Sequence, residues 1–146
     1  MVNRESIERP HERLEVWRDA MELVEAIYRF SSSFPADERF GLASQIRRAA
    51  VSIPSNIAEG AARRSRPEYL RFLSIARGSL SEVDTQLQVA GRLGMLDYDA
   101  NLVELVDRTF SRLNALIRAL DPTPRSIREM PAYYESRIPN PESHAR

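Results

Sequence analysis

The sequence contains no cysteine, no lysine and only two histidines among its 146 residues. Without cysteine, the chain has no disulfide, no zinc–thiolate site and no thiol nucleophile. The histidines, His11 and His144, lie near opposite ends of the chain, so no histidine between them is placed to activate a serine. The few glycines form no phosphate-binding loop. We therefore expect a protein that is not an enzyme and that uses no metal ion and no cofactor.

The sequence also lacks long hydrophobic stretches. No run of about 18 apolar residues is present, so we expect no transmembrane helix and no membrane partner. The first 15 residues are polar and charged, without the apolar segment of a signal peptide. These features predict a cytoplasmic protein.

Helical periodicity organises the middle of the chain. Amphipathic stretches cover residues 12–33, 37–62, 66–93 and 99–120, and no alternating pattern of strand type stands out. The connections between them are short, which favours antiparallel neighbours. We predict an all-α protein whose single domain, residues 12–120, is an up-down-up-down antiparallel four-helix bundle. Residues 1–11 are predicted to form a flexible arm, and residues 121–146, with five of the nine prolines, a disordered tail.

The second stretch contains a proline in its interior. Pro54 removes a helical hydrogen bond and collides with the carbonyl group of Ala50, at a cost of about 3 kcal/mol. Asn56 and Gly60 weaken the helix further. We predict a kinked helix that tertiary contacts hold in place, and the alternative is a helix that ends near Ser52 and then restarts.

The first and last stretches carry more apolar residues than a bundle core requires. Each has two adjacent apolar stripes, whereas a monomeric bundle helix needs about three apolar positions in seven. One stripe can face the core while the other meets a second subunit, which predicts a homo-oligomer. The alternative is that the extra residues widen the core stripe.

Positive charge is concentrated in one part of the chain, although the formal net charge is zero. Between positions 47 and 77, seven arginines face only Glu59 and Glu68, so this segment has a net charge of +5. Arginine forms multi-donor contacts that suit phosphate groups, which makes these residues candidates for binding RNA or DNA. A solvated face, or ion pairs with the acidic helices, is the competing interpretation. The candidates are Arg47, Arg48, Arg63, Arg64, Arg66, Arg71 and Arg77.

Two carboxylates raise a separate question about chemistry. Glu59 and Glu82 lie on the second and third predicted helices, where two acids can meet across an interface. Such a pair can serve acid–base catalysis, but structural hydrogen bonds or pairing with arginine are more ordinary roles.

Three segments resemble a known family: residues 14–17 (LEVW), residues 53–60 and residues 71–82, the last with Ser79 and Glu82. They resemble the small bacterial four-helix-bundle proteins encoded in intervening sequences of 23S ribosomal RNA, and the likeness spans about residues 14–120. The signature of residues 53–60 comprises Ile53, Pro54, Ser55, Asn56, Ile57, Ala58, Glu59 and Gly60.

The resemblance implies a homopentameric ring of four-helix bundles. It also implies a link to the accessory proteins of diversity-generating retroelements, which work with a reverse transcriptase and nucleic acid. The family supplies no catalytic residues. Two functions therefore remain open, a nucleic-acid-binding accessory protein and a protein-interaction scaffold that binds no nucleic acid.

Overall fold

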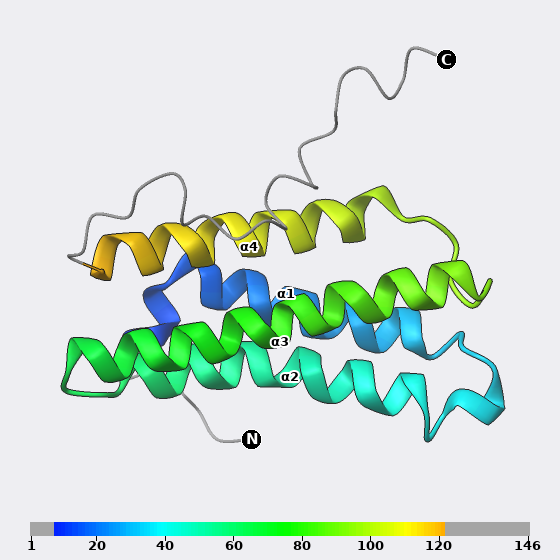
Figure 1. Ribbon diagram of the computed structural model, residues 1–146, viewed down its shortest axis with the longest axis horizontal. Coiled ribbons are helices and arrows are strands. Elements are labelled where there is room, and N and C mark those ends of the chain that lie inside the picture. The colour runs from blue at the N-terminus through cyan, green and yellow to red at the C-terminus, as the bar shows by residue number, and fades with distance from the viewer. Residues whose placement is uncertain (1–7, 122–146) are drawn as a thin grey trace, which may run out of the picture.

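The computed structural model describes residues 8–121. Over this range the protein is an all-α, antiparallel four-helix bundle without a strand, as the sequence predicts (Figure 1). Residues 1–7 of the predicted flexible arm and residues 122–146 of the predicted disordered tail lie outside the described residues. The bundle helices are α1 (Glu15–Ser31), α2 (Leu42–Ala61), α3 (Arg66–Arg92) and α4 (Ala100–Leu120), with short 3-10 helices η1 (Pro10–Arg13) and η2 (Ala36–Glu38).

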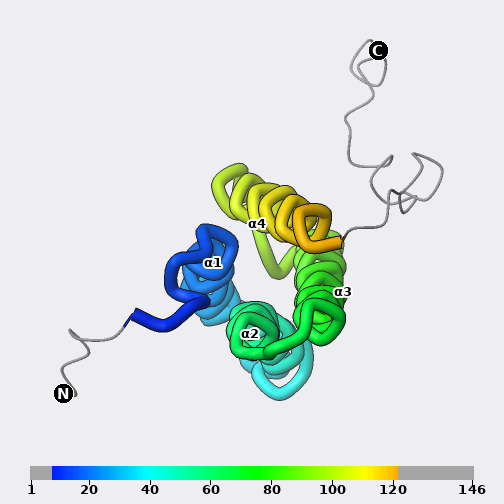
Figure 2. Tube along the Cα trace, turned by 90° about the vertical axis from the view of Figure 1, so that its left-hand side faces the viewer, coloured from blue at the N-terminus to red at the C-terminus, as the bar shows by residue number. Residues whose placement is uncertain are grey.

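The helices follow one another around the bundle. Seen end-on, α1, α2 and α3 form an arc, and α4 closes it by lying across α1 and α3 (Figure 2). The α2–α3 pair packs more extensively than any other, and the backbones of the diagonal pairs α1–α3 and α2–α4 do not approach each other closely within residues 8–121. The α2–α3 interface is therefore the best place to look for sequence features that fix the fold.

The core consists of one continuous apolar cluster. Large side chains with less than 2 % exposure come from each of the four bundle helices, including Leu23, Ile53, Leu80 and Leu113. Burial of each such side chain stabilises the fold by about 1.5–3 kcal/mol. Thr109 is also fully buried, and its hydroxyl group donates to the carbonyl oxygen of Leu105 at 2.7 Å, so its polar group is satisfied within α4.

The two apolar stripes predicted for each of the first and last helices differ in how far the structure buries them. On α1, Met21 and Tyr28 belong to the same apolar stripe and remain 41 % and 45 % exposed. On α4, Phe110 and Ile117 from the second stripe are buried inside the protomer, and Val103 is its exposed member. A wide core stripe thus accounts for most of the apolar surface of α4, while α1 keeps an apolar outer side.

The second helix begins later than predicted. The prediction started it at residue 37, but α2 begins at Leu42, after the short η2 helix and Gly41. Gly41 has φ −99° and ψ −113°, which takes the backbone out of the helical region. The carboxylate of Glu38 then accepts a hydrogen bond from the backbone N–H of Leu42 at 3.0 Å and caps the new helix.

The first helix also begins late, because Pro10–Arg13 forms η1 and α1 starts at Glu15. The predicted flexible arm included His11. In the structure the imidazole ring of His11 packs edge-on against the Trp17 ring, with 4.9 Å between centroids. This contact holds η1 on the bundle.

The helix α2 passes through Pro54 without interruption, so the alternative of a helix that ends near Ser52 is wrong. Other helix ends follow the sequence signals. Ser65 caps α3 by accepting a hydrogen bond from the backbone N–H of Glu68 at 3.3 Å. Gly94 has φ +72° and ends α3, a left-handed conformation that favours glycine.

Candidate nucleic-acid interface

The signature residues lie in the second half of α2 and divide between its buried and exposed sides. Ile53 and Ile57 are fully buried in the core, and Pro54 is buried beside them. Ser55 is exposed, and its hydroxyl group donates to the carbonyl oxygen of Val51 at 2.8 Å. Most of the signature therefore supports the fold of α2 rather than presenting groups to a ligand.

A polar cluster joins the signature to the third helix. The Nδ2 of Asn56 donates to the carbonyl oxygen of Ser52 at 2.7 Å and to its Oγ at 2.9 Å. The same Ser52 Oγ lies 2.8 Å from the Oγ of Ser79 on α3. Two residues of the family resemblance, Asn56 and Ser79, are thus connected through Ser52, which lies one residue outside the eight-residue signature.

At Gly60, α2 and α3 approach each other closely. A Cβ atom added to Gly60 would lie 2.8 Å from the Cβ of Phe72 and 3.0 Å from the Cδ2 of Tyr69. Real Cβ atoms do not come this close to neighbouring atoms, so the position admits only glycine without a shift of α3. Burial raises the pKa of the nearby Tyr69 hydroxyl above its ordinary value.

Glu59 and Glu82 do not form a catalytic pair. The Ser52–Ser79 contact sets the antiparallel register, and it places Glu59 and Glu82 in opposite directions along the interface, about 15 Å apart at 1.5 Å per residue. Glu59 pairs with Arg63 at 3.1 Å, and Glu82 accepts a hydrogen bond from Gln86 at 3.2 Å. Each carboxylate has an ordinary structural partner.

Four candidate arginines gather at the end of the bundle where α2 turns into α3. We call Arg63, Arg64, Arg66 and Arg71 the turn cluster; all four are exposed. The guanidinium carbons of Arg63 and Arg71 each lie 4.8 Å from the centroid of the Phe72 ring. Arg64 and Arg66 have no hydrogen bond or ion pair with any side chain in residues 8–121. The cluster therefore combines two arginines held against an aromatic ring with two whose side chains have no polar partner among the described residues.

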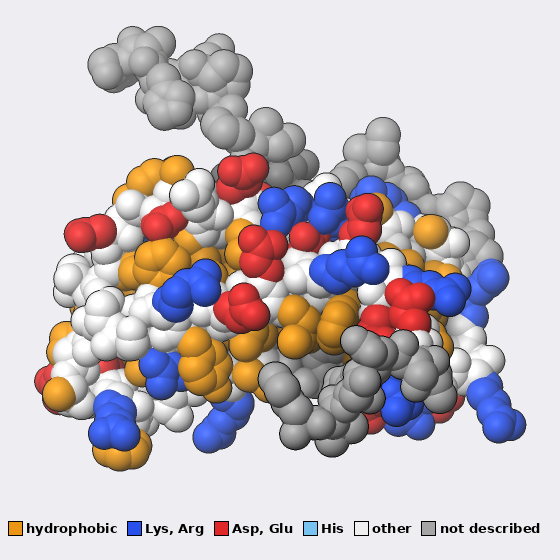
Figure 3. All heavy atoms as spheres, turned by 180° about the vertical axis from the view of Figure 1, so that it is seen from behind, with side chains coloured by type: hydrophobic (Ala, Val, Ile, Leu, Met, Phe, Trp, Pro, Cys, Tyr) orange, Lys and Arg blue, Asp and Glu red, His pale blue; other side chains and the backbone are white. Residues whose placement is uncertain are grey.

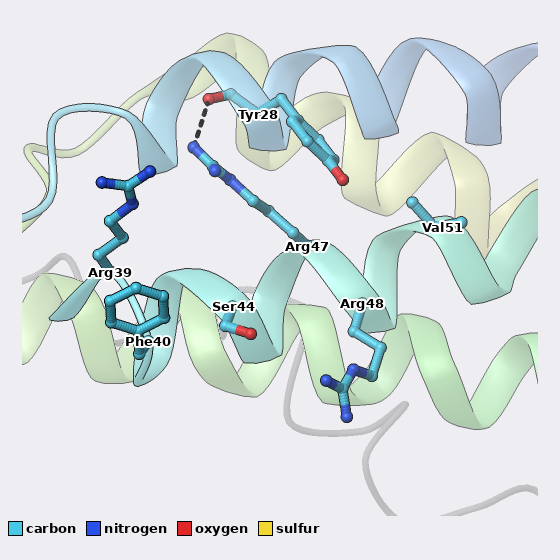
Figure 4. A pocket seen from close by; sticks show the side chains of 7 residues that line it. All are labelled: Tyr28, Arg39, Phe40, Ser44, Arg47, Arg48 and Val51. Atoms are coloured by element: carbon cyan, nitrogen blue, oxygen red, sulfur yellow. Dashed lines mark hydrogen bonds between the residues drawn. The ribbon is translucent and has the colours of Figure 1, made fainter.

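Arg47 and Arg48 lie near the other end of α2, beside the C-terminal turns of α1. They line an open pocket of about 470 Å³, which we call the α1–α2 pocket; its lining residues are Tyr28, Arg39, Phe40, Ser44, Arg47, Arg48 and Val51 (Figure 4). Arg47 reaches across to α1, where its Nε donates to the Ser31 Oγ at 2.6 Å and its Nη2 to the Tyr28 carbonyl oxygen at 3.4 Å. Arg48 extends on the side away from α1 (Figure 4).

Arg77 belongs to neither group. Its side chain is half-buried, and its Nη1 donates to the Oδ1 of Asn114 on α4 at 3.3 Å. The structure therefore does not bring the seven candidates together in one patch. From Arg48 to Arg63 the helix advances about 22 Å, more than twice the distance over which physiological salt screens exposed charges. The two groups act as separate basic sites.

Three acidic residues of α1, Glu15, Asp19 and Glu22, are paired with arginines that are not candidates. Asp19 is 4 % exposed; its Oδ1 accepts a hydrogen bond from the Nε of Arg108 at 3.2 Å, and its Oδ2 one from the Nη1 of Arg112 at 2.8 Å. The hydrogen bond with Asp19 raises the pKa of Arg112, and the charges of Asp19 and Glu15 raise it further against partial desolvation. The view of the α1 side shows acidic and basic side chains intermingled (Figure 3).

The sequence analysis named only two of the seven lining residues of the α1–α2 pocket as candidates and missed Tyr28, Arg39, Phe40, Ser44 and Val51. Arg39 lies outside the arginine-rich segment, Phe40 lies in the stretch predicted to be helical, and Tyr28 lies in one of the two apolar stripes of the first predicted helix. The adjacent Arg39 and Phe40 gave a local signal, a basic residue beside an aromatic one. Their position opposite Tyr28 depends on how α1 packs on α2.

Within residues 8–121, no group of three or more histidine, aspartate or glutamate side chains is placed to hold a metal ion. None of the helices described here is both long and apolar enough to cross a membrane.

A comparison with curated proteins finds no match. A family model described as the 23S rRNA-intervening sequence protein matches residues 12–117, which span α1, α2, α3 and nearly all of α4. This match confirms the likeness that residues 53–60 and 71–82 predict. The chain belongs to the 23S rRNA-intervening sequence protein family.

Proposed function

We propose that this chain is a non-enzymatic protein that binds RNA or DNA and works as a homo-oligomer. One observation carries the proposal: of the seven candidate arginines, only Arg63 forms an ion pair with a carboxylate of residues 8–121. Glu15, Asp19 and Glu22 of α1 are instead paired with Arg108 and Arg112. Unpaired surface guanidinium groups are the donors that phosphate oxygens require.

The turn cluster is the stronger of the two basic sites for a nucleic-acid backbone. Arg63 and Arg71 lie over the Phe72 ring, which limits their motion before any ligand arrives. Ordering of side chains in advance lowers the entropic cost of binding. Arg64 and Arg66 are exposed beside them, so several phosphates along one strand can be contacted at once.

The test measures affinity for a labelled 20-nucleotide RNA and for a duplex of the same length, by fluorescence anisotropy over a range of salt concentrations. The variant R63Q/R64Q/R66Q removes three charges from the turn cluster. Each lost phosphate contact lowers the slope of log affinity against log salt by about 0.7–0.9, so we expect a decrease of about two in the slope. The matched control R29Q/R92Q/R118Q removes the same charge from exposed arginines elsewhere, and its slope should stay that of the wild type.

Failure of the wild-type protein to bind either probe at about 50 mM salt would overturn the nucleic-acid proposal and leave the protein-interaction scaffold. An equal loss of slope in both triple variants would show that binding does not depend on the turn cluster.

The homo-oligomer is proposed from the outer side of α1. Met21 and Tyr28 are seven residues apart and so share one face of the helix, and both are more than 40 % exposed. Val51 on the adjacent α2 is 42 % exposed as well. Apolar side chains lie between charged ones on this side of the molecule (Figure 3). A second copy of the chain that covers these side chains would bury them at about 25 cal/mol per Å².

Sedimentation velocity at micromolar concentration tests the oligomer. The wild type should sediment as a particle several times heavier than the 16.7 kDa chain. Met21→Glu should reduce the number of subunits, because it places a charge in the contact. Ile75→Glu on α3 is the control, since Ile75 is exposed to the same 42 % as Val51 but lies on another helix. A wild type that sediments as a single chain would refute the oligomer.

A further inference from the structure

Phe40 is 89 % exposed, the largest value among the exposed large apolar side chains of the described residues. It lies in the turn between η2 and α2, and the guanidinium carbon of Arg39 lies 5.6 Å from its ring centroid. The remainder of the ring faces solvent. An aromatic ring in this setting is a surface on which another flat, apolar group can stack.

Phe40 forms one end of the α1–α2 pocket. Figure 4 shows Arg39 and Phe40 at this end, Val51 at the other, and Arg47 spanning the space to Tyr28 between them. The lining includes three arginines and no acidic residue. The nearest carboxylate in sequence, that of Glu38, is already held by the backbone N–H of Leu42. A pocket of about 470 Å³ falls within the usual range for small-molecule and cofactor sites.

The three arginines have different tasks. Arg47 is fixed by its hydrogen bonds to Ser31 and Tyr28, and its guanidinium carbon lies 4.8 Å from the Tyr28 ring centroid. It therefore orients the Tyr28 ring. The side chains of Arg48 and Arg39 form no hydrogen bond or ion pair within residues 8–121, and the Arg39 guanidinium group lies beside the Phe40 ring. Arg39 and Arg48 are thus left to meet an anionic ligand.

We propose that the α1–α2 pocket binds an unpaired nucleotide of a single-stranded nucleic acid. The base stacks on the open face of Phe40, and Arg39 and Arg48 contact the flanking phosphates. Bases inside a duplex are stacked on each other and cannot reach a protein ring, whereas an unpaired base can. The inference rests on the proposed function and adds to it a preference for single strands, which the turn cluster alone does not supply.

The experiment uses the full-length protein and a 20-nucleotide oligouridylate with one central 2-aminopurine, together with a duplex of the same length. Stacking of 2-aminopurine on an aromatic ring changes its fluorescence, so the probe reports the contact directly. The variant Phe40→Leu removes the ring and keeps an apolar side chain. The matched control is Tyr98→Leu, since Tyr98 is 83 % exposed but lies in the α3–α4 connection.

Phe40→Leu should weaken binding to the single strand about tenfold, the usual effect of losing one stacked base, and should abolish the fluorescence change. Its affinity for the duplex should stay that of the wild type, because the turn cluster is intact. Arg39→Gln should weaken single-strand binding without removing the fluorescence change. Tyr98→Leu should behave as the wild type with both probes.

The outcomes separate this inference from the proposed function. Suppose that the wild type binds the single strand and the duplex with the same affinity, and that Phe40→Leu binds as Tyr98→Leu does. The α1–α2 pocket then binds no nucleotide, but the proposal that the protein binds nucleic acid is still supported. If the wild type binds neither probe, the proposed function fails and this inference fails with it.

Discussion

The hydroxyl oxygens of Ser52 and Ser79 lie 2.8 Å apart across the α2–α3 interface. Ser52 is also bonded twice by the side-chain amide of Asn56, through its carbonyl oxygen and its Oγ. The contact fixes the register of the two helices that pack most extensively. A slip by one residue would separate the two serines and leave polar groups unsatisfied in a half-buried interface.

Replacement of Asn56 by leucine tests this polar cluster. Asn56→Leu should lower the free energy of unfolding by about 1–2 kcal/mol, since the amide donor is lost and the Ser52 hydroxyl loses a partner. Urea unfolding followed by circular dichroism measures the change. Asn101→Leu makes the same substitution at an exposed position of α4 and should have little effect. Equal stability of the two variants would contradict a structural role for Asn56.

Gly60 and Gly78 offer a matched pair of substitutions. Alanine is about 1 kcal/mol better than glycine in a helix, so Gly78→Ala in the middle of α3, with nothing within 4 Å of the added Cβ, should stabilise the protein. Gly60→Ala should do the opposite and cost about 1–3 kcal/mol, because its Cβ would lie 2.8 Å from the Cβ of Phe72. The Phe72 Cβ cannot move without its backbone. A stabilised Gly60→Ala protein would show that α3 yields easily at this point.

The bundle was predictable because its signals are local. Apolar spacing and caps such as Ser65 depend on residues within a few positions of each other. The start of α2 was predicted five residues early because the apolar pattern continues through Gly41, whose backbone leaves the helix. Glu38, which caps α2, lies in a segment whose sequence pattern predicts a helix.

The candidate site was only partly predictable, for a geometric reason. A count of charge along the chain puts Arg47 and Arg77 in one group. Residues of a long helix can lie far apart, however. In the structure Arg47 on α2 contacts α1, and Arg77 on α3 contacts α4. Packing, not sequence distance, then brings Tyr28 to Arg47 across 19 positions. A single sequence has no signal for this pairing.

The ion pairs of Asp19 join α1 to α4, so their loss should lower the stability of the bundle. Asp19→Asn should lower the free energy of unfolding by about 1–3 kcal/mol, less than for a fully buried pair because Arg108 and Arg112 are about 40 % exposed and can be hydrated. Glu22→Gln removes a carboxylate that is 59 % exposed and should cost less than about 1 kcal/mol. Chemical denaturation of the two variants compares them. A larger loss for Glu22→Gln would reverse the ranking of these contacts.

Because the chain has no lysine and no cysteine, the effect of Tyr69 ionisation on stability can be measured from the pH dependence of unfolding. With neither residue present, tyrosines are the side chains that titrate near pH 10. Burial raises the pKa of Tyr69 above 10.0, so above this pH the unfolded state loses the proton before the folded state does. The folded state then holds more protons, and the free energy of unfolding falls as the pH rises through the folded-state pKa. Below pH 10 this contribution is fully present.

Tyr69→Phe removes the titrating hydroxyl group and should make the free energy of unfolding fall less steeply above pH 10. Near pH 7 the hydroxyl group is protonated, so any change in stability there comes from the loss of the hydroxyl group and not from its ionisation. Thermal unfolding between about pH 8 and pH 11 measures the slope. Tyr98→Phe, at an 83 % exposed position, should keep the wild-type slope. Tyr69 lies beside Gly60, where α2 and α3 pack closely. If Tyr69→Phe leaves the slope of stability against pH unchanged, this end of the interface becomes accessible to water before Tyr69 ionises.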